Sequence, residues 1–287
     1  MRLRICHATT YRYSAPVVFG PHRLMLRPRD GHDLRVLESL LTISPNAEIS
    51  WRYDTFGNSV ADAEFQTDSD TLSIRSDLLI ERYPYDAVLF SGRRPPIALP
   101  VSYSVDDVID LAPFMRLENP DEQEILGAWL DANFATRPAA VLSFMQALSE
   151  AIHSSFAYSR RDELGTQTAA RTIESGSGTC RDFAFFFMEA VRYFGFAARF
   201  VTGYLYDQST EGTLEGGGAT HAWADVFLPN EGWVEFDPTN RITGGAALIR
   251  VATTRTPAQA SPISGTFEGN GATFLDMDVS VTVTQEP

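Results

Sequence analysis

Polar and apolar residues alternate along residues 1–90, and this alternation predicts β-strands. Turn-forming pairs such as Gly20-Pro21 and Asp30-Gly31 separate the alternating stretches. The expected strands are 2–13, 22–27, 34–43, 51–53, 59–65 and 71–83. Short strands at this spacing are typical of a β-sandwich. We therefore expect an N-terminal antiparallel β-sandwich domain over residues 1–90.

The period of the pattern changes after a connection at 91–118, whose first part is rich in proline. Asn119-Pro120, followed by two acidic residues, is typical of a helix start, because acids favour the positive N-terminal end of a helix. Apolar residues then recur three or four positions apart, which indicates two amphipathic helices. We assign to their buried faces Ile125, Leu126, Trp129, Leu130, Val141, Phe144, Met145, Leu148 and Ile152.

The last third of the chain returns to strand patterns. The expected strands are 198–206, 221–228, 232–236 and 273–284. A turn at Pro229-Asn230-Glu231-Gly232 makes the second and third of these antiparallel neighbours. We place residues 119–287, the last strand included, in one α+β unit.

Cys180 is the first candidate for chemistry. It follows the glycine-rich stretch 176–179 and precedes apolar residues that share one helical face, namely Phe183, Phe187, Val191 and Phe194. Cys180 should therefore lie at a helix N-terminus, where unpaired N–H groups and the helix dipole stabilise an anion. A free thiol is only a few per cent thiolate at neutral pH, so this placement favours a nucleophile. The alternative is a buried, inert cysteine.

His221 and Asp237 complete a candidate triad. His221 begins one expected strand and Asp237 follows the next, so antiparallel pairing puts both at the same edge of the sheet. The imidazole can take the thiol proton and then hold the thiolate as an ion pair. The carboxylate can fix the imidazole tautomer. The simpler alternatives are a capped or solvated histidine and an aspartate that opens a turn.

Four blocks of sequence around these residues resemble the transglutaminase-like superfamily. They are GTCRDFA (178–184), AARFVTGY (197–204), HAWADV (221–226) and GWVEFDPTN (232–240). Residues 1–85 are similar to the N-terminal domain of bacterial members. The resemblance implies a papain-like, transglutaminase-like cysteine-hydrolase core with Cys180 as nucleophile, His221 as base and Asp237 as the residue that orients it. It implies no cofactor, and no calcium-loop spacing is present.

This chemistry is acyl transfer through a thioester on a carboxamide, either a Gln side chain or a peptide bond of a protein or peptide substrate. An amine acceptor would make the protein a transglutaminase, and water would make it an amidase or cysteine protease. The sequence leaves the acceptor and the oligomeric state open. The alternative function is a catalytically inactive binding or scaffold module.

Composition narrows the partners and the compartment. The net charge is −14, and residues 101–287 carry 11 Arg against 25 acidic residues, which argues against a nucleic-acid-binding surface. No apolar run is long enough to span a membrane. Two cysteines make no disulfide framework, and the start of the sequence has no signal-peptide pattern, so we expect a cytoplasmic protein. No metal spacing links His7, His22, His32 and His153.

The sequence gives weaker evidence for the roles of five further side chains. Asp182 and Asp225 either orient loops or pair with arginines. Trp223 and Trp233 are expected in the core rather than as a substrate platform. An oxyanion hole needs the Cys180 N–H and a second donor, for which Tyr158 is a guess.

Overall fold

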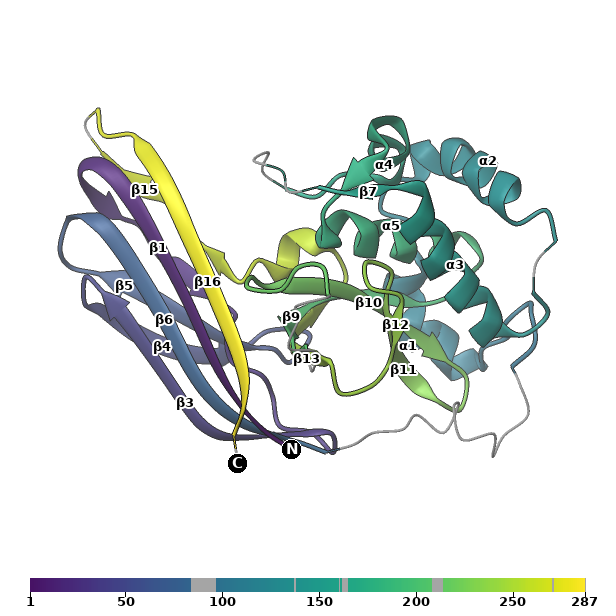
Figure 1. The fold of residues 1–287 in the computed structure, drawn as a ribbon, viewed down its shortest axis with the longest axis horizontal. Helices are drawn as coiled ribbons and strands as arrows, with labels where there is room; N and C mark the ends of the chain where they lie inside the picture. Colours follow the sequence, from purple (N-terminus) through teal and green to yellow (C-terminus); the bar gives the residue numbers. More distant parts are fainter. Residues whose placement is uncertain are drawn as a thin grey trace.

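The computed structural model describes residues 1–83, 97–136, 138–159, 161, 165–207, 214–269 and 271–286. Strands dominate the N-terminal part, and helices cover one face of a second sheet in the rest of the chain (Figure 1). The two chain ends lie close together at the foot of the first part (Figure 1). The proline-rich start of the expected connection, 91–96, lies outside the described residues.

Two antiparallel sheets form the N-terminal sandwich. One has the strand order β15-β1-β6-β3, with β16 also paired to β1, and the other has the order β14-β2-β5-β4. The strands are β1 (Arg2–Phe19), β2 (His22–Leu24), β3 (Leu34–Ser44), β4 (Ala47–Tyr53), β5 (Ser59–Phe65), β6 (Ser69–Arg82), β14 (Ile263–Ser264), β15 (Phe267–Glu268) and β16 (Phe274–Glu286). The predicted antiparallel sandwich is confirmed.

The alternation along β1 serves two different cores. Residues from its second half, such as Tyr13 and Val17, are buried between the two sheets of the sandwich. Leu3 and Ile5 of its first half pack instead against Tyr204 and Ile249 of the second sheet. One long strand therefore joins the sandwich to the rest of the protein.

The α+β unit contains a sheet of order β12-β11-β10-β9-β13. Its elements are α1 (Val105–Met115), a 3₁₀ turn (Pro120–Glu122), α2 (Gln123–Asn133), α3 (Val141–Ser155), β7 (Ala157–Tyr158), α4 (Ala169–Ser175), β8 (Ser177–Gly178), α5 (Cys180–Tyr193), β9 (Ala198–Leu205), β10 (His221–Leu228), β11 (Gly232–Asp237), β12 (Ile242–Thr243), β13 (Leu248–Thr254) and a 3₁₀ turn (Pro257–Ala260). Helix α5 packs on β10, and its residues are buried on almost every side. The fold class is α+β, as predicted.

The last strand corrects the expected unit 119–287. Strand β16 pairs with β1 from Arg2↔Glu286 to Tyr13↔Phe274, so it belongs to the N-terminal sandwich. The edge of β1 has unpaired backbone groups, and β16 satisfies them. After β13 the chain thus returns to the sandwich, a step that strand periodicity alone does not reveal.

Three smaller expectations also change. The expected connection contains α1, which Ser104 caps by accepting from the Asp107 backbone N–H. Ile125 is 51% exposed and does not join the core, whereas Leu126 and Leu130 are buried. Strand β13 was not predicted at all. Among the residues that the structure describes, no helix has the length and apolar character to span a membrane.

Candidate active site

Cys180 is the first residue of α5. Its N-terminal neighbour Thr179 is the N-cap residue, and Asp182 Oδ2 completes a capping box by accepting from the Thr179 N–H and hydroxyl, at 2.8 and 2.9 Å. Asp182 is fully buried and also accepts from Arg161 at 2.9 and 3.0 Å. Cys180 therefore lies at the positive end of the helix dipole, and the contacts of Asp182 with Thr179 and Arg161 hold the first turn of the helix in place.

His221 and Asp237 meet at the edge of the sheet. Strands β10 and β11 pair antiparallel from Leu228↔Gly232 to Ala224↔Phe236, as the turn between them predicted. His221 Nε2 lies 2.8 Å from Asp237 Oδ2, and both side chains are fully buried. The hairpin thus places the imidazole and the carboxylate in direct contact.

The buried pair holds a proton. Burial by itself lowers the pKa of His221, but the Asp237 carboxylate and then the Cys180 sulfur outweigh burial and raise the pKa to about 10. Burial by itself raises the pKa of Asp237. The imidazolium and the hydrogen bonds from Asn240 and Thr239 outweigh burial and hold this pKa below its usual range. At neutral pH the pair is therefore an imidazolium and a carboxylate.

Cys180 and His221 line one small cavity of about 200 Å³. Because Asp237 engages Nε2, Nδ1 is the ring nitrogen left to exchange a proton with the sulfur. Nδ1 is buried and has no hydrogen-bond partner among the described residues. The structure therefore brings the three predicted side chains into one arrangement, with His221 in the middle.

Comparison with known proteins decides the family. Residues 3–81 match the bacterial transglutaminase-like N-terminal region, and residues 130–238 match the transglutaminase-like superfamily. The chain belongs to the transglutaminase-like superfamily. The predicted family is thus confirmed, together with its bacterial N-terminal region.

This transglutaminase-like chain is similar over nearly its whole length to uncharacterised mycobacterial proteins. Rv2569c of Mycobacterium tuberculosis is 28% identical over 98% of this chain and 92% of its own length. ML0607 of Mycobacterium leprae is 26% identical over 98% of each chain. A crystal structure described as a "Putative Cysteine Protease" from Cytophaga hutchinsonii has 21% identity and a TM-score of 0.75, covering 100% of this chain and 92% of that one. This structural likeness shows a shared fold.

Asn240 is a site residue that sequence reasoning did not single out, although it ends the last of the four blocks. Its amide nitrogen donates to Asp237 Oδ2 at 3.0 Å and to the Glu215 carbonyl at 3.1 Å. Its amide oxygen accepts from the Glu215 N–H at 2.8 Å. Asn240 therefore clamps the loop at 214–218 to the carboxylate of the candidate triad in this transglutaminase-like protein.

The clamped loop lies directly over the imidazole. A Cβ atom on Gly216, whose φ is +87°, would stand 2.8 Å from His221 Nδ1 and 3.5 Å from the Tyr158 hydroxyl. Only glycine fits this close approach at a positive φ. Under the loop, Cys180 is 7% and His221 1% exposed. The run Gly216-Gly217-Gly218 is visible in the sequence, but the sequence does not show that it covers the site.

Tyr158 lies beside the sulfur. Its strand β7 pairs with β8 immediately before α5, with Tyr158 opposite Gly178. Burial and then the nearby Cys180 raise the pKa of its hydroxyl, which therefore stays protonated and able to donate. This position suits the second oxyanion donor expected from the sequence, a role that stays a prediction.

The two aspartates and two tryptophans with weaker expectations make structural contacts. Asp182 both pairs with Arg161 and holds the segment before α4, since it accepts from the Gln167 N–H at 2.7 Å. Asp225 pairs with Arg199 at 2.8 Å. Trp223 is fully buried, as expected. Trp233 is partly buried, and the Arg199 guanidinium lies 4.3 Å above its ring.

Histidines outside the candidate triad make ordinary polar contacts. His7 is hydrogen-bonded to Tyr204 and Thr9, His22 to the Gly20 carbonyl, and His153 to the Thr239 carbonyl. Within the described part of the chain, no three His, Cys, Asp or Glu side chains are grouped so that they could hold a metal ion.

Proposed function

We propose that the protein transfers an acyl group from a carboxamide through a thioester on Cys180. The thiolate attacks the carbonyl carbon, a C–S bond forms, and the C–N bond then breaks. His221 gives its proton to the leaving nitrogen, which departs as ammonia or an amine. The acceptor next loses a proton to His221 and attacks the thioester, and the Cys180 thiolate is set free.

One observation carries this proposal: the 2.8 Å contact of His221 with Asp237 behind a cysteine at the start of a helix. The raised pKa of His221 supports its role as the acid in the first step, since it already carries the proton that the leaving nitrogen needs. Asp237 stabilises this imidazolium without taking its proton. An inactive scaffold has no physical need for this arrangement, which disfavours that alternative.

Developing negative charge on the substrate oxygen would be met by two donors. The Cys180 backbone N–H points from the helix N-terminus, and we assign Tyr158 as the second donor. Preorganised donors of this kind each contribute about 10²–10³ in turnover. Tyr158→Phe should therefore lower turnover while leaving alkylation of Cys180 intact.

The covering of the site supports one acceptor over the other. The loop at 214–218 covers the imidazole, and the cavity beside the sulfur is small. A site that excludes water favours transfer to an amine over hydrolysis. We therefore propose a primary amine as the preferred acceptor, with water as the competing one.

The test is ammonia release from Gln-containing peptides, measured with and without an added primary amine. We expect amine incorporation into the peptide and complete loss of turnover in Cys180→Ala. Replacement of His221 should lower turnover by two or more orders of magnitude. Turnover retained by folded Cys180→Ala would rule out the mechanism, and release of peptide fragments instead of ammonia would identify a protease.

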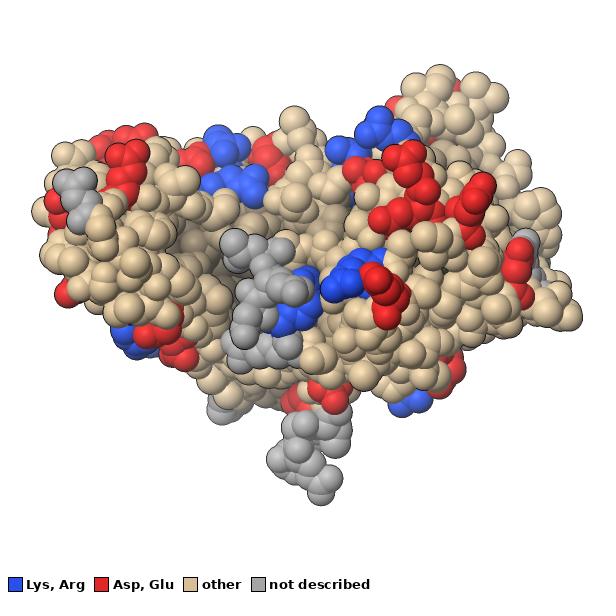
Figure 2. Space-filling view, turned by 90° about the horizontal axis from the view of Figure 1, so that it is seen from above, with Lys and Arg blue, Asp and Glu red and all other residues tan. Residues whose placement is uncertain are grey.

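We propose a protein or peptide as the substrate and do not expect a nucleic acid. Figure 2 shows acidic side chains on both halves of the face that it draws, with arginines among them. Residues 101–287 carry 11 Arg against 25 acidic residues, which argues against a nucleic-acid substrate. The compartment stays a prediction: both cysteines are free, which suits the cytoplasm. Cell fractionation with an antibody against the protein would test it.

A further inference from the structure

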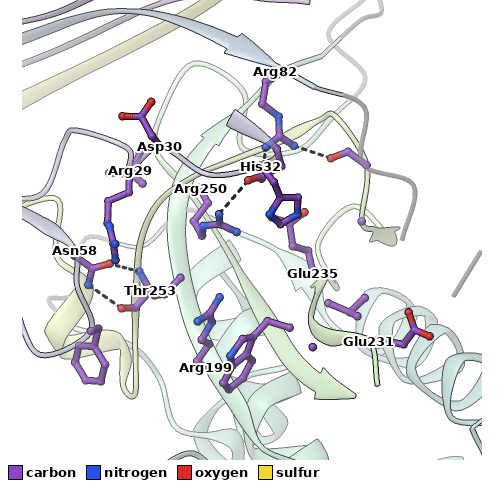
Figure 3. A pocket seen from close by; sticks show the side chains of 18 residues that line it. Arg29, Asp30, His32, Asn58, Arg82, Arg199, Glu231, Glu235, Arg250 and Thr253 are labelled. Carbon is purple, nitrogen blue, oxygen red and sulfur yellow. Dashed lines mark hydrogen bonds and ion pairs between the residues drawn. The ribbon is translucent and has the colours of Figure 1, made fainter. Parts of the chain in front are cut away.

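A second and larger cavity lies on the far side of the catalytic sheet. It measures about 470 Å³ and is lined both by the N-terminal sandwich and by strands β9, β11 and β13 (Figure 3). Residues of these strands alternate in direction: Phe200 and Phe236 face α5, so Arg199 and Glu235 face away from it. The cavity is therefore separate from the one that contains Cys180. Its volume lies within the range of small-molecule sites.

Two ion pairs account for much of the charge in this cavity. Arg82 bonds Asp33 at 3.0 Å and the Gly245 carbonyl at 3.0 Å. Arg199 bonds Asp225 at 2.8 Å and stacks on Trp233. Each of these four charged groups has an ion-pair partner within the protein, while Asp33 Oδ1, Arg82 Nε and Asp225 Oδ1 have no hydrogen-bond partner among the described residues.

Arg250 and Glu235 differ from these groups, because neither side chain makes a close hydrogen bond to another described residue. The Arg250 guanidinium reaches only the far oxygen of Asp33, at 3.6 Å, and 32% of its side chain is exposed. Glu235 Oε1 is buried and has no hydrogen-bond partner among the described residues. Both residues line the cavity, and both are labelled in Figure 3. A buried oxygen without a donor destabilises the protein unless a ligand supplies one.

The strand register explains why Glu235 is unsatisfied. It lies directly opposite Asp225 in the β10–β11 ladder, so two carboxyl groups are neighbours. Burial and then Asp225 raise the pKa of Glu235 to about 8, while Arg250 and Arg82 act in the opposite sense. The charged and titratable groups that face it from the other elements are Asp225, Arg199, Arg250, Arg82, Asp33 and His32. At neutral pH the empty site therefore keeps a proton on Glu235.

We propose that this cavity binds a small zwitterion, a free amino acid or a short peptide, with its carboxylate on Arg250 and its amino group on Glu235. A guanidinium presents a fork that suits a carboxylate. An ammonium group supplies the donor that Glu235 lacks, and Glu235 releases its proton to solvent as the ion pair forms. Arg250 and Glu235 thereby match the two charges of one ligand.

The test is calorimetry on the full chain at pH 7 with the twenty standard L-amino acids and glycylglycine as probes. At least one probe should bind with 1:1 stoichiometry. Its binding heat should vary with the ionisation heat of the buffer, because up to one proton leaves Glu235 per ligand bound. N-acetylated or C-amidated forms of that probe should bind at least tenfold more weakly, since each lacks one of the two charges.

Variants separate this cavity from the site at Cys180. Glu235→Gln should remove the proton release, and Arg250→Met should weaken binding at least tenfold. Cys180→Ala should bind the probe as the wild type does. Unchanged thermal unfolding of the two cavity variants checks that they fold, and an Arg250→Lys variant that recovers part of the affinity serves as a second check. The proposal is overturned if no probe binds at 10 mM, if both cavity variants bind normally, or if Cys180→Ala abolishes binding.

Discussion

Asn240 donates to Asp237 Oδ2 at 3.0 Å, on the same carboxylate oxygen that contacts His221 Nε2 at 2.8 Å. The amide therefore fixes the carboxylate from one side while the imidazole holds it from the other. Because Asn240 also bonds both backbone groups of Glu215, movement of the covering loop and orientation of the triad are linked.

Removal of this amide should reduce turnover without unfolding the protein. We expect Asn240→Ala to lower kcat for ammonia release by at least about tenfold, because small displacements of catalytic groups are costly. Asn133→Ala is the matched control, since its exposed amide bonds only the Trp129 carbonyl at the end of α2. Equal kcat values for the two variants would show that Asn240 does not position the triad.

Two glycines of the covering loop offer a sharper comparison. Gly216→Ala forces a Cβ to within 2.8 Å of His221 Nδ1, whereas a Cβ on Gly218 meets nothing within 4 Å. Both glycines have positive φ, +87° and +80°, so alanine strains the backbone in both variants, by roughly 1–2 kcal/mol. Thermal unfolding should shift alike in the two variants. We expect kcat to fall more than tenfold only in Gly216→Ala, and an equal loss in both would attribute the effect to backbone strain.

The sequence predicted those parts of the site that depend on local structure. Cys180 at the helix start follows from the loop and the periodicity behind it, and the His221–Asp237 contact follows from one short hairpin. The contacts of Asn240 and Gly216 depend on where a loop folds back in space, and no periodicity encodes that. These are the contacts that complete the site.

The same limit applies to the fold. The alternation in residues 274–286 predicts a strand but does not say which sheet edge will accept it, and β16 joins the N-terminal sandwich. The prediction that Ile125 is buried was wrong for a related reason. The width of the buried stripe on a helix depends on the neighbouring helices, which the sequence does not show. The sequence could have predicted that Asp225 lies opposite Glu235, because the hairpin register determines this pair.

The pH dependence of stability should report the charged pair. The pKa of His221 is raised in the folded state, so its stabilisation is complete below the unfolded value of about 6.5 and is lost as pH rises towards 10. Urea unfolding of the wild type and Asp237→Asn at pH 6.5 and 9.5 measures this contribution. The wild type should be the more stable at pH 6.5, and the difference should shrink at pH 9.5. Glu235 titrates in both proteins, so its contribution cancels in the difference between their free energies of unfolding. A difference that is the same at both pH values would contradict an imidazolium in the folded state.

The N-terminal sandwich also contacts the covering loop. The Val281 N–H of β16 donates to the Gly218 carbonyl at 2.9 Å, and so points away from the ladder with β1. Val281→Pro removes this bond and leaves the ladder intact, because proline is tolerated where a strand's N–H faces outward. One such hydrogen bond contributes about 1 kcal/mol, which corresponds to about a fivefold shift in loop closure.

We therefore expect faster hydrogen exchange of the backbone amides at 214–218 in Val281→Pro and a lower ratio of amine incorporation to hydrolysis. Val279→Pro controls for proline at an outward-facing position of the same strand, since no backbone bond joins the Val279 N–H to the described part of the loop. Val281 is buried and Val279 only partly buried, so the readout is exchange at 214–218 and not overall stability. If Val281→Pro exchanges no faster than Val279→Pro, the sandwich does not restrain the loop. Faster exchange with an unchanged product ratio would mean that the loop opens too rarely to admit water during turnover.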